Sequence, residues 1–190
     1  MKLNEERINT IYKVTDTHIH GFFNKHRYLS NFHLHSIEYE GIIYPSNENA
    51  YQAAKMLPGD PQPFLMRDDK GLPCMITRLD FASFTPSESK NKGRSISLRA
   101  DWLSGLNTGL CPDNLITQVR DKIMYDINVI KFSNPQLRNL LLETGDRYLE
   151  ETNWWKDDYW GTCNGTGLNK LGRILMKIRD EAKQKQKEAA

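Results

Sequence analysis

The chain has 190 residues, 38% of them hydrophobic and 26% charged, and its formal net charge is +2. These values are those of an ordinary soluble globular protein, and the length suits one domain with a hydrophobic core. No apolar stretch approaches the roughly 20 residues that span a bilayer, and the small net charge gives the whole molecule no strong attraction to nucleic acid. The amino terminus, Met1–Arg7, carries both signs of charge and no apolar h-region, so we expect a cytoplasmic protein without a secretory signal.

The first part of the chain favours short strands and loops over helices. Residues 8–44 are rich in β-branched and aromatic side chains and are punctuated by Gly21 and Gly41. The run 38–44 predicts a hairpin, or a pair of strand ends, that closes at Pro45.

Helical signals follow. Ser46 can cap a helix over residues 47–56, which Pro58–Gly59 ends. Residues 58–73 carry several prolines and glycines and predict a loop-rich insertion. Thr85–Glu88 then starts another helix, with a threonine cap, a proline at the first helical position and the glutamate of a capping box.

The last third of the chain predicts three helices. Apolar residues recur at helical spacing over Leu115–Ile130, and Asn134–Pro135 caps the next helix. A final helix has its apolar side over Leu168–Ile178, and the basic tail at 181–190 is expected to fray. These patterns predict a mostly α (α+β) fold, a single helical domain over residues 1–190 with a small N-terminal antiparallel β element.

The first candidate site lies on the helix predicted over residues 47–56. Glu48, Gln52 and Lys55 are spaced by four and three residues, so they share one helical face. A carboxylate and an amine on adjoining turns suit proton transfer, or attack by the amine on a sugar carbon freed by ring opening. Spacing alone favours a plain exposed helix with one surface interaction. Position favours a site, because the helix directly follows Pro45 and its first turn can face a site wall.

The second candidate is the Asp-Asp-Tyr-Trp-Gly run that begins at Asp157. Asp158 close to Trp160, followed by Gly161, suits a site that stacks a flat base and offers a carboxylate to the base edge or to a ribose hydroxyl. A core aromatic cluster explains the preceding Trp154–Trp155, whereas the neighbouring acid and glycine favour a site role for Trp160.

The third candidate is Asp101–Trp102, another acid beside an indole. It follows a basic segment in which Arg94 and Arg99 can bind a phosphate or a diphosphate by bidentate hydrogen bonds. Charge alone favours a solvated helix face for this segment, so the third candidate is weaker than the other two.

Metal and nucleotide-binding motifs are incomplete. The three cysteines are dispersed, which argues against a disulfide framework and a zinc site. His18–His20 and His33–His35 each place two histidines on one strand face, but no cysteine or aspartate completes a ligand set. Gly165–Lys170 begins like a dinucleotide fingerprint but lacks the third glycine and a preceding βαβ unit. We therefore expect neither a metal nor another cofactor.

Five segments, in order, resemble the YbiA/NADAR family and cover about residues 22–180. They carry the family motifs Leu-Ser-Asn-Phe, Tyr-Pro-Ser-x-Glu with Tyr-Gln-Ala-Ala-Lys, and Asp-Tyr-Trp-Gly. The matching segments are Tyr28–Phe32, Gly41–Lys55, Gly93–Trp102, Met124–Glu151 and Asp158–Arg179. One such segment is a weak signal, but five in the family's order are hard to obtain by accident.

The chain departs from the family pattern in two places. The family usually has a histidine after the glutamate of its second segment, where this chain has Asn49. A proton transfer that uses that histidine has to proceed differently here. Residues 55–81 also contain a proline-rich stretch without a clear counterpart, which can alter substrate choice.

The resemblance implies a helical protein that hydrolyses N-glycosidic bonds of ribose derivatives. Two substrate classes are associated with the family. One is ADP-ribose attached to a guanine amino group in nucleic acid, which is removed to reverse a toxin's modification. The other is the ribosylamino-pyrimidine phosphates of early riboflavin synthesis, which are destroyed before they cause damage. We expect guanine-linked ADP-ribose on DNA to be the preferred substrate.

The resemblance and the chemistry of N-riboside cleavage together assign roles. Cleavage develops positive charge at the anomeric carbon and needs a proton at the leaving nitrogen. Glu48 is expected to stabilise that charge or activate water, and Asp158 to orient ribose hydroxyls or act as a partner acid. Lys55 is expected to donate to the leaving group or to trap an opened sugar as a Schiff base. The substrate-binding residues expected from the family motifs are Asn31, Gln52, Arg94, Trp102, Tyr159, Trp160, Gly161 and Asn169, with Trp102 and Trp160 sandwiching the base.

Two other functions stay open. A non-catalytic module that binds ADP-ribose or NAD would leave Glu48 and Lys55 with structural roles, and tight ADP-ribose binding without product release would indicate it. A regulatory protein that binds another protein is least favoured, because it does not require acids and indoles to be paired twice. We expect neither a membrane nor an obligate protein partner. The modest net charge does not decide between DNA and a small molecule, because an extruded base can be held by a few local contacts.

Overall fold

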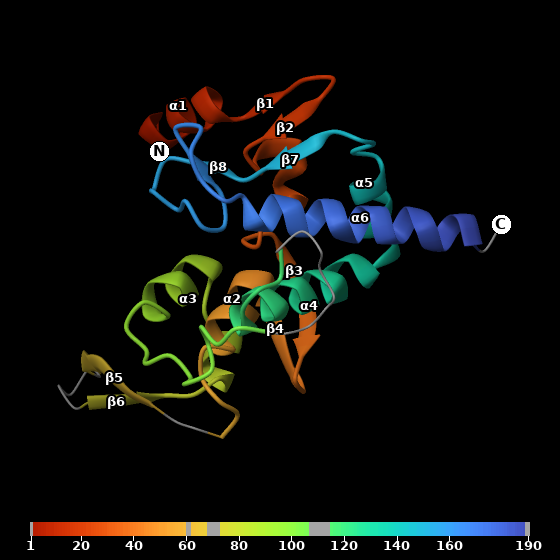
Figure 1. The fold of residues 1–190 in the computed structure, drawn as a ribbon. Helices are drawn as coiled ribbons and strands as arrows, with labels where there is room; N and C mark the ends of the chain where they lie inside the picture. The colour runs from red at the N-terminus through yellow and green to blue at the C-terminus, as the bar shows by residue number, and fades with distance from the viewer. Residues whose placement is uncertain (1, 60–61, 68–72, 107–114, 189–190) are drawn as a thin grey trace. The chain divides into compact units, whose positions relative to one another are not determined.

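The computed structural model describes residues 2–59, 62–67, 73–106 and 115–188. They fall into two units, one of Met1–Ser30 with Phe132–Ala190 and the other of Asn31–Lys131. The fold class is α+β with helices predominant, as predicted (Figure 1). No described helix is long and apolar enough to cross a membrane. The single domain stays a prediction.

The first unit is built on a sheet of β1 (Lys13–Val14), β2 (His18–His20) and β7 (Tyr148–Glu150). β2 pairs antiparallel with β1, which confirms the predicted N-terminal β element, and parallel with β7. α6 (Lys170–Glu188) packs against β7, and α5 (Pro135–Leu142) packs against α6 (Figure 1). The core side chains of this layer are Ile19, Leu141, Leu149, Leu171, Ile174 and Leu175.

Short elements complete the first unit. They are α1 (Lys2–Ile11), the 3₁₀ helix η1 (Asn24–Leu29), β8 (Thr152–Asn153) and β9 (Thr162–Cys163). The prediction of strands and loops from residue 8 onward is wrong at its start, because α1 extends to Ile11. Ile8 and Ile11 are half-buried and three residues apart among polar residues, so these β-branched side chains mark one side of a helix.

Two details of the final helix differ from the prediction. Leu168 lies outside α6 and is exposed, because Asn169 has a positive φ of 47° and separates it from the first helical residue. The tail does not fray near residue 181 but stays helical to Glu188. Pairs such as Lys177 with Glu181, whose charged atoms are 3.1 Å apart, support an exposed helix at a spacing of four residues.

The second unit begins with an antiparallel hairpin of β3 (Leu34–Tyr39) and β4 (Ile42–Ser46). The sequence predicts this hairpin, and its turn residues Glu40 and Gly41 have φ angles of +49° and +78°. Two successive positive φ angles are what a two-residue turn of type I′ requires. α2 (Asn47–Ala53) follows β4 without a loop, so the sheet fixes the start of this helix.

Two predicted helix caps of this second unit are confirmed. The Ser46 hydroxyl accepts a hydrogen bond from the backbone N–H of Asn49 at 3.2 Å and caps α2, which ends before the predicted residue 56. Thr85 and Glu88 form the complete capping box of α3 (Pro86–Lys92). Both caps satisfy backbone N–H groups that a helix leaves unpaired at its start.

The predicted loop over residues 58–73 is wrong in part. It contains β5 (Gln62–Arg67), which pairs antiparallel with β6 (Pro73–Ile76) in a hairpin (Figure 1). The prediction was wrong because it took the prolines as evidence against a strand. Proline removes a ladder hydrogen bond from a central strand but is tolerated in an edge strand. Both strands of a two-stranded sheet are edge strands. The 3₁₀ helix η2 (Leu79–Ala82) follows the hairpin.

The long helix predicted from Leu115 begins later, as α4 (Val119–Ser133). Leu115 is buried but precedes the helix. The Asp121 carboxylate accepts hydrogen bonds from the backbone N–H groups of Thr117 at 3.0 Å and Gln118 at 3.1 Å. The buried carboxylate therefore sets the helix start, while the apolar periodicity begins about one turn earlier.

Candidate active site

Glu48 lies in the first turn of α2, and only 6% of its surface is exposed. Its Oε1 accepts a hydrogen bond from Gln52 Nε2 at 2.8 Å. Its backbone N–H donates to the carbonyl oxygen of Asn31 at 3.0 Å. The structure thus holds the carboxylate from its own helix and the backbone from a distant segment.

Lys55 lies just beyond α2, and its Nζ donates to the carbonyl oxygen of Gly93 at 2.8 Å. Burial lowers the pKa of Lys55 to about 8; Glu48 raises this pKa, while Lys90 and Arg94 lower it. A lysine amine in this setting is partly neutral near physiological pH and can act as a nucleophile. Glu48 and Lys55, the predicted carboxylate and amine, are therefore electrostatically coupled, as proton transfer or attack of the amine on a sugar carbon requires.

Gly93 allows α3 to approach α2 closely. A Cβ at this position would overlap the side-chain amide of Gln52. Only glycine therefore brings its carbonyl to Lys55 while Gln52 stays hydrogen-bonded to Glu48. Sequence reasoning gave Gly93 no role in the site, because a glycine at a helix end is explained by capping alone.

Asn49 occupies the position of the usual family histidine and is fully buried. Its Nδ2 donates to the carbonyl oxygens of Phe81 and Phe84 and to Ser89 Oγ, at 2.8, 2.7 and 2.7 Å. Its Oδ1 accepts from Ser46 Oγ at 2.5 Å. Asn49 therefore joins α2 to η2 and α3. Because adjacent residues of a helix are about 100° apart around its axis, the Asn49 side chain does not lie on the same face of α2 as Glu48.

The residues of the third candidate have separate environments. Trp102 is 4% exposed, and its ring lies against Tyr51 with centroids 5.2 Å apart. Arg99 forms a bidentate ion pair with Asp101 at 2.5 and 2.8 Å, whereas Arg94 is exposed. Arg99 is thus already paired with a carboxylate, and base stacking by Trp102 stays a prediction.

The Asp-Asp-Tyr-Trp-Gly run of the other unit forms a braced turn. Asn153 Nδ2 donates to the Asp157 carbonyl oxygen at 2.7 Å, and Asn153 Oδ1 accepts from the Asp157 N–H at 3.1 Å. The Asp157 carboxylate accepts from the Trp160 N–H at 2.9 Å, whereas Asp158 is exposed. The rings of Tyr159 and Trp160 meet edge to face with centroids 5.0 Å apart. The two acids therefore differ, since Asp157 braces the turn and Asp158 presents its side chain to solvent.

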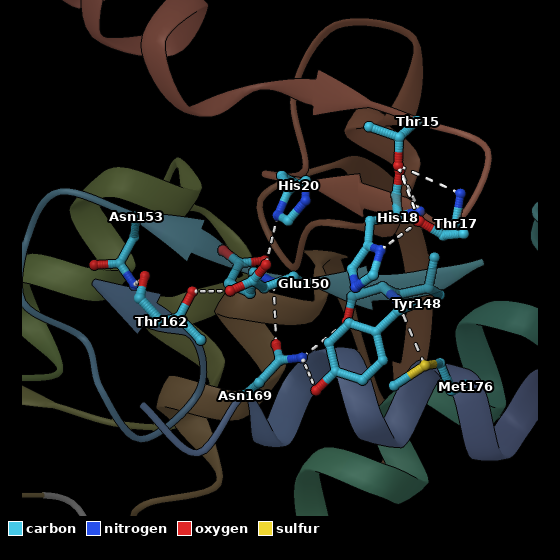
Figure 2. Close-up of polar contacts among 12 residues, drawn as sticks. Thr15, Thr17, His18, His20, Tyr148, Glu150, Asn153, Thr162, Asn169 and Met176 are labelled. Atoms are coloured by element: carbon cyan, nitrogen blue, oxygen red, sulfur yellow. Dashed lines mark hydrogen bonds and ion pairs between the residues drawn. The ribbon is translucent and has the colours of Figure 1, made fainter. Parts of the chain in front are cut away.

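Gly161 and Asn169 hold this turn against β7. A Cβ on Gly161 would overlap the carbonyl oxygen of Glu151. Asn169 is buried, and its Nδ2 donates to the Leu149 carbonyl oxygen at 2.8 Å and to Tyr148 Oη at 3.2 Å (Figure 2). Its Oδ1 accepts from the Glu151 N–H at 3.0 Å. Both ends of the Asn169 amide are engaged in structure, and substrate binding by Asn169 stays a prediction.

The strand-face histidines of β2 join a polar network instead of a metal cluster. His20 Nδ1 lies 2.5 Å from Glu150 Oε2, and Glu150 Oε1 accepts from Thr162 Oγ1 at 2.6 Å (Figure 2). The His18 ring stacks on His20 with centroids 5.2 Å apart, and its Nδ1 lies 2.8 Å from Thr17 Oγ1. The described residues contain no group of three or more His, Cys, Asp or Glu side chains placed to hold a metal ion.

The predicted site residues form two groups, one in each unit. The group within residues 31–131 is Asn31, Glu48, Gln52, Lys55, Arg94 and Trp102. The group in the other unit is Asp158, Tyr159, Trp160, Gly161 and Asn169. Within the first group, hydrogen bonds join Glu48 to Asn31 and to Gln52, and electrostatic coupling joins Glu48 and Arg94 to Lys55.

Known proteins resemble the chain along most of its length. A family model described as the NADAR domain matches residues 12–183. An N-glycosidase of Nostoc punctiforme is 33% identical over 156 residues, which cover 80% of this chain and 83% of that protein. A riboflavin biosynthesis protein of Vibrio vulnificus is 33% identical over 160 residues, which cover 82% of this chain but 35% of that longer protein.

A solved structure agrees with these sequence matches. The NMR structure of the Escherichia coli protein YbiA matches with a TM-score of 0.65 and 27% identity, covering 96% of this chain and 94% of that one. In sequence, the N-glycosidase YbiA of Escherichia coli is 26% identical over 183 residues, which cover 95% of this chain and 97% of that protein.

The Asn49 contacts predict that replacing Asn49 lowers the stability of the protein but does not change its turnover. Asn49→Ala leaves the carbonyls of Phe81 and Phe84 without their donor, and we expect the free energy of unfolding to fall by about 2 kcal/mol or more. Urea unfolding measures this change, with Ser87→Ala at an exposed position of α3 as the control. Turnover by the folded fraction should be unchanged. Lost turnover at unchanged stability would show instead that Asn49 takes part in the chemistry.

Proposed function

Because the chain belongs to the NADAR family and is a hydrolase acting on N-glycosyl bonds, we propose that its preferred substrate is guanine-linked ADP-ribose on DNA. The observation that carries the proposal is the coupling of half-buried Lys55, with its pKa lowered to about 8, to buried Glu48. Burying a lysine beside further cations opposes folding, and such perturbed groups concentrate at functional sites.

The chemistry of an N-riboside fits these two groups. The neutral Lys55 amine attacks the anomeric carbon as the bond to the guanine nitrogen breaks, and that nitrogen takes up the proton that the attacking amine loses. The Glu48 carboxylate stabilises the positive charge that develops at the anomeric carbon. The bond between the anomeric carbon and the ring oxygen then breaks, the ring oxygen takes up the remaining proton of the Lys55 nitrogen, and the opened sugar is held as a Schiff base. One water molecule hydrolyses this Schiff base to free ADP-ribose and the regenerated amine. The net reaction consumes one water for each bond cleaved.

The local charge supports a substrate that carries phosphate. Lys90 and Arg94 both act on Lys55, and Glu48 is the one carboxylate among the groups that shift its pKa. A diphosphate, such as that of ADP-ribose, would offset this excess of positive charge and can accept bidentate hydrogen bonds from Arg94. In the other unit, exposed Asp158 is proposed to orient ribose hydroxyls, and Trp160 to stack the base.

A second substrate class is supported by the relatives. Matches include riboflavin biosynthesis proteins of Vibrio vulnificus and of Zea mays. A ribosylamino-pyrimidine phosphate contains the same kind of N-riboside bond and one phosphate, so the same groups would cleave it. A module that only binds ADP-ribose has no need for a lysine with a lowered pKa.

The rate should depend on pH through Lys55. As the pH rises through about 8, the amine loses its proton, so kcat/KM should rise and then level off. Removing a neighbouring cation with Lys90→Gln should raise the pKa of Lys55 and move the midpoint to higher pH. Lys92→Gln is the matched control, because Lys92 lies over the Phe84 ring and is not among the groups that shift Lys55. A rate that falls through the same range would make Lys55 the proton donor to the leaving group.

A parallel assay decides the substrate. Purified protein is given a guanine-ADP-ribosylated oligonucleotide and riboflavin-pathway ribosylamines, and mass spectrometry follows loss of the sugar. We expect the oligonucleotide to react faster, and Glu48→Gln to slow its turnover by about 100-fold or more. Glu38→Gln, at an exposed carboxylate of β3, should have no effect.

Three outcomes of this assay would contradict the proposal. Faster loss of the ribosylamine would assign the second substrate class. Tight ADP-ribose binding without any cleavage would indicate a binding module. Unchanged turnover by Glu48→Gln would remove the proposed role of the carboxylate.

A further inference from the structure

Three asparagines are buried together next to the first turn of α2. Asn31, Asn47 and Asn128 are 7%, 1% and 0% exposed. Asn47 Nδ2 donates to Asn128 Oδ1 at 3.0 Å and to Asn31 Oδ1 at 3.4 Å. Asn128 Nδ2 donates to the Met124 carbonyl oxygen at 2.9 Å. Amides withdrawn from water in this way depend on one another for hydrogen bonds.

This asparagine cluster holds the backbone that carries Glu48. The Asn31 carbonyl oxygen accepts the Glu48 N–H, and Asn47 precedes Glu48 in the chain. The Asn31 side chain is itself held by Asn47, by Asn128 at 3.5 Å and by Met124 Sδ at 3.2 Å. Both the residue before Glu48 and the carbonyl that accepts its N–H therefore belong to the cluster.

The cluster is not the arrangement that stability alone would favour. Asn47 Oδ1 is buried and accepts no hydrogen bond from the described residues. Such an unsatisfied acceptor lowers stability, and apolar side chains of matching shape would avoid this penalty. Local features that oppose stability without structural compensation tend to mark functional positions.

We propose that Asn128 and Asn47 are positioning residues for N-riboside hydrolysis, which act by fixing the Asn31 carbonyl and through it the placement of Glu48. The inference rests on the proposed function of Glu48. Asn31, expected to bind substrate, thereby acquires a second role through its backbone. Asn128 lies on α4, far from Glu48 in the sequence, and affects the placement of Glu48 through the asparagine cluster.

Replacing Asn128 tests the proposal. Asn128→Ala should lower kcat by about 10- to 100-fold, because a small displacement of a reacting group has effects of this size. KM should change less than kcat, since the expected substrate-binding side chains other than Asn31 are untouched. Ile127→Ala is the matched control, because Ile127 is the fully buried neighbour of Asn128 on α4 and has no part in the cluster. It should lose stability through a cavity but keep its kcat.

A second measurement does not depend on turnover. Hydrogen exchange of the Glu48 backbone amide, followed by NMR, should be faster in Asn128→Ala than in Ile127→Ala. If Asn128→Ala does not fold, Asn128→Ser, which replaces the amide with a shorter hydroxyl, takes its place in both measurements. A kcat equal to that of Ile127→Ala, or unchanged protection of the Glu48 amide, would overturn the proposal. If the unaltered protein cleaves no N-riboside, the proposed function fails, and the exchange rates still decide whether Asn128 holds Glu48.

Discussion

The close approach of α3 to α2 at Gly93 is the constraint on which the Glu48 site depends. It exists because no Cβ stands between the Gly93 backbone and the Gln52 amide. It lets the Gly93 carbonyl accept the Lys55 amine at 2.8 Å while Gln52 donates to Glu48 at 2.8 Å. The same packing partly buries Lys55, and this burial is the largest cause of its lowered pKa. One contact between two short helices thus positions both the Glu48 carboxylate and the Lys55 amine.

This arrangement opposes folding. The pKa of Lys55 is about 8 in the folded chain against an ordinary value of 10.5, so the unfolded chain binds the proton more tightly. Protonation of this amine therefore lowers stability below about pH 8, and the penalty disappears as the pH rises past the unfolded value. The unsatisfied amide oxygen of Asn47 adds a second cost in the same unit. Active sites commonly give up stability in this way.

Local features of the fold could be predicted from the sequence. The Ser46 cap, the Thr85–Glu88 capping box and the Asn134 cap each depend on hydrogen bonds within a few residues. Local sequence also places Glu48 and Gln52 on one face of a helix. Packing between distant segments could not be predicted this way, because spacing along one helix does not reveal that Gly93 meets Gln52 or that Asn128 meets Asn47. For the same reason, Asn49 could not be recognised from its position alone as a link to α3.

The central claim is that Lys55 forms a covalent intermediate with the ribose, and trapping tests it most directly. The protein is incubated with the guanine-ADP-ribosylated oligonucleotide and borohydride, which reduces a Schiff base to a stable secondary amine. Peptide mass spectrometry should then find the sugar on Lys55 and find none on a Lys55→Arg variant. Continued turnover with no trapped sugar, or a sugar trapped on another residue, would contradict the account.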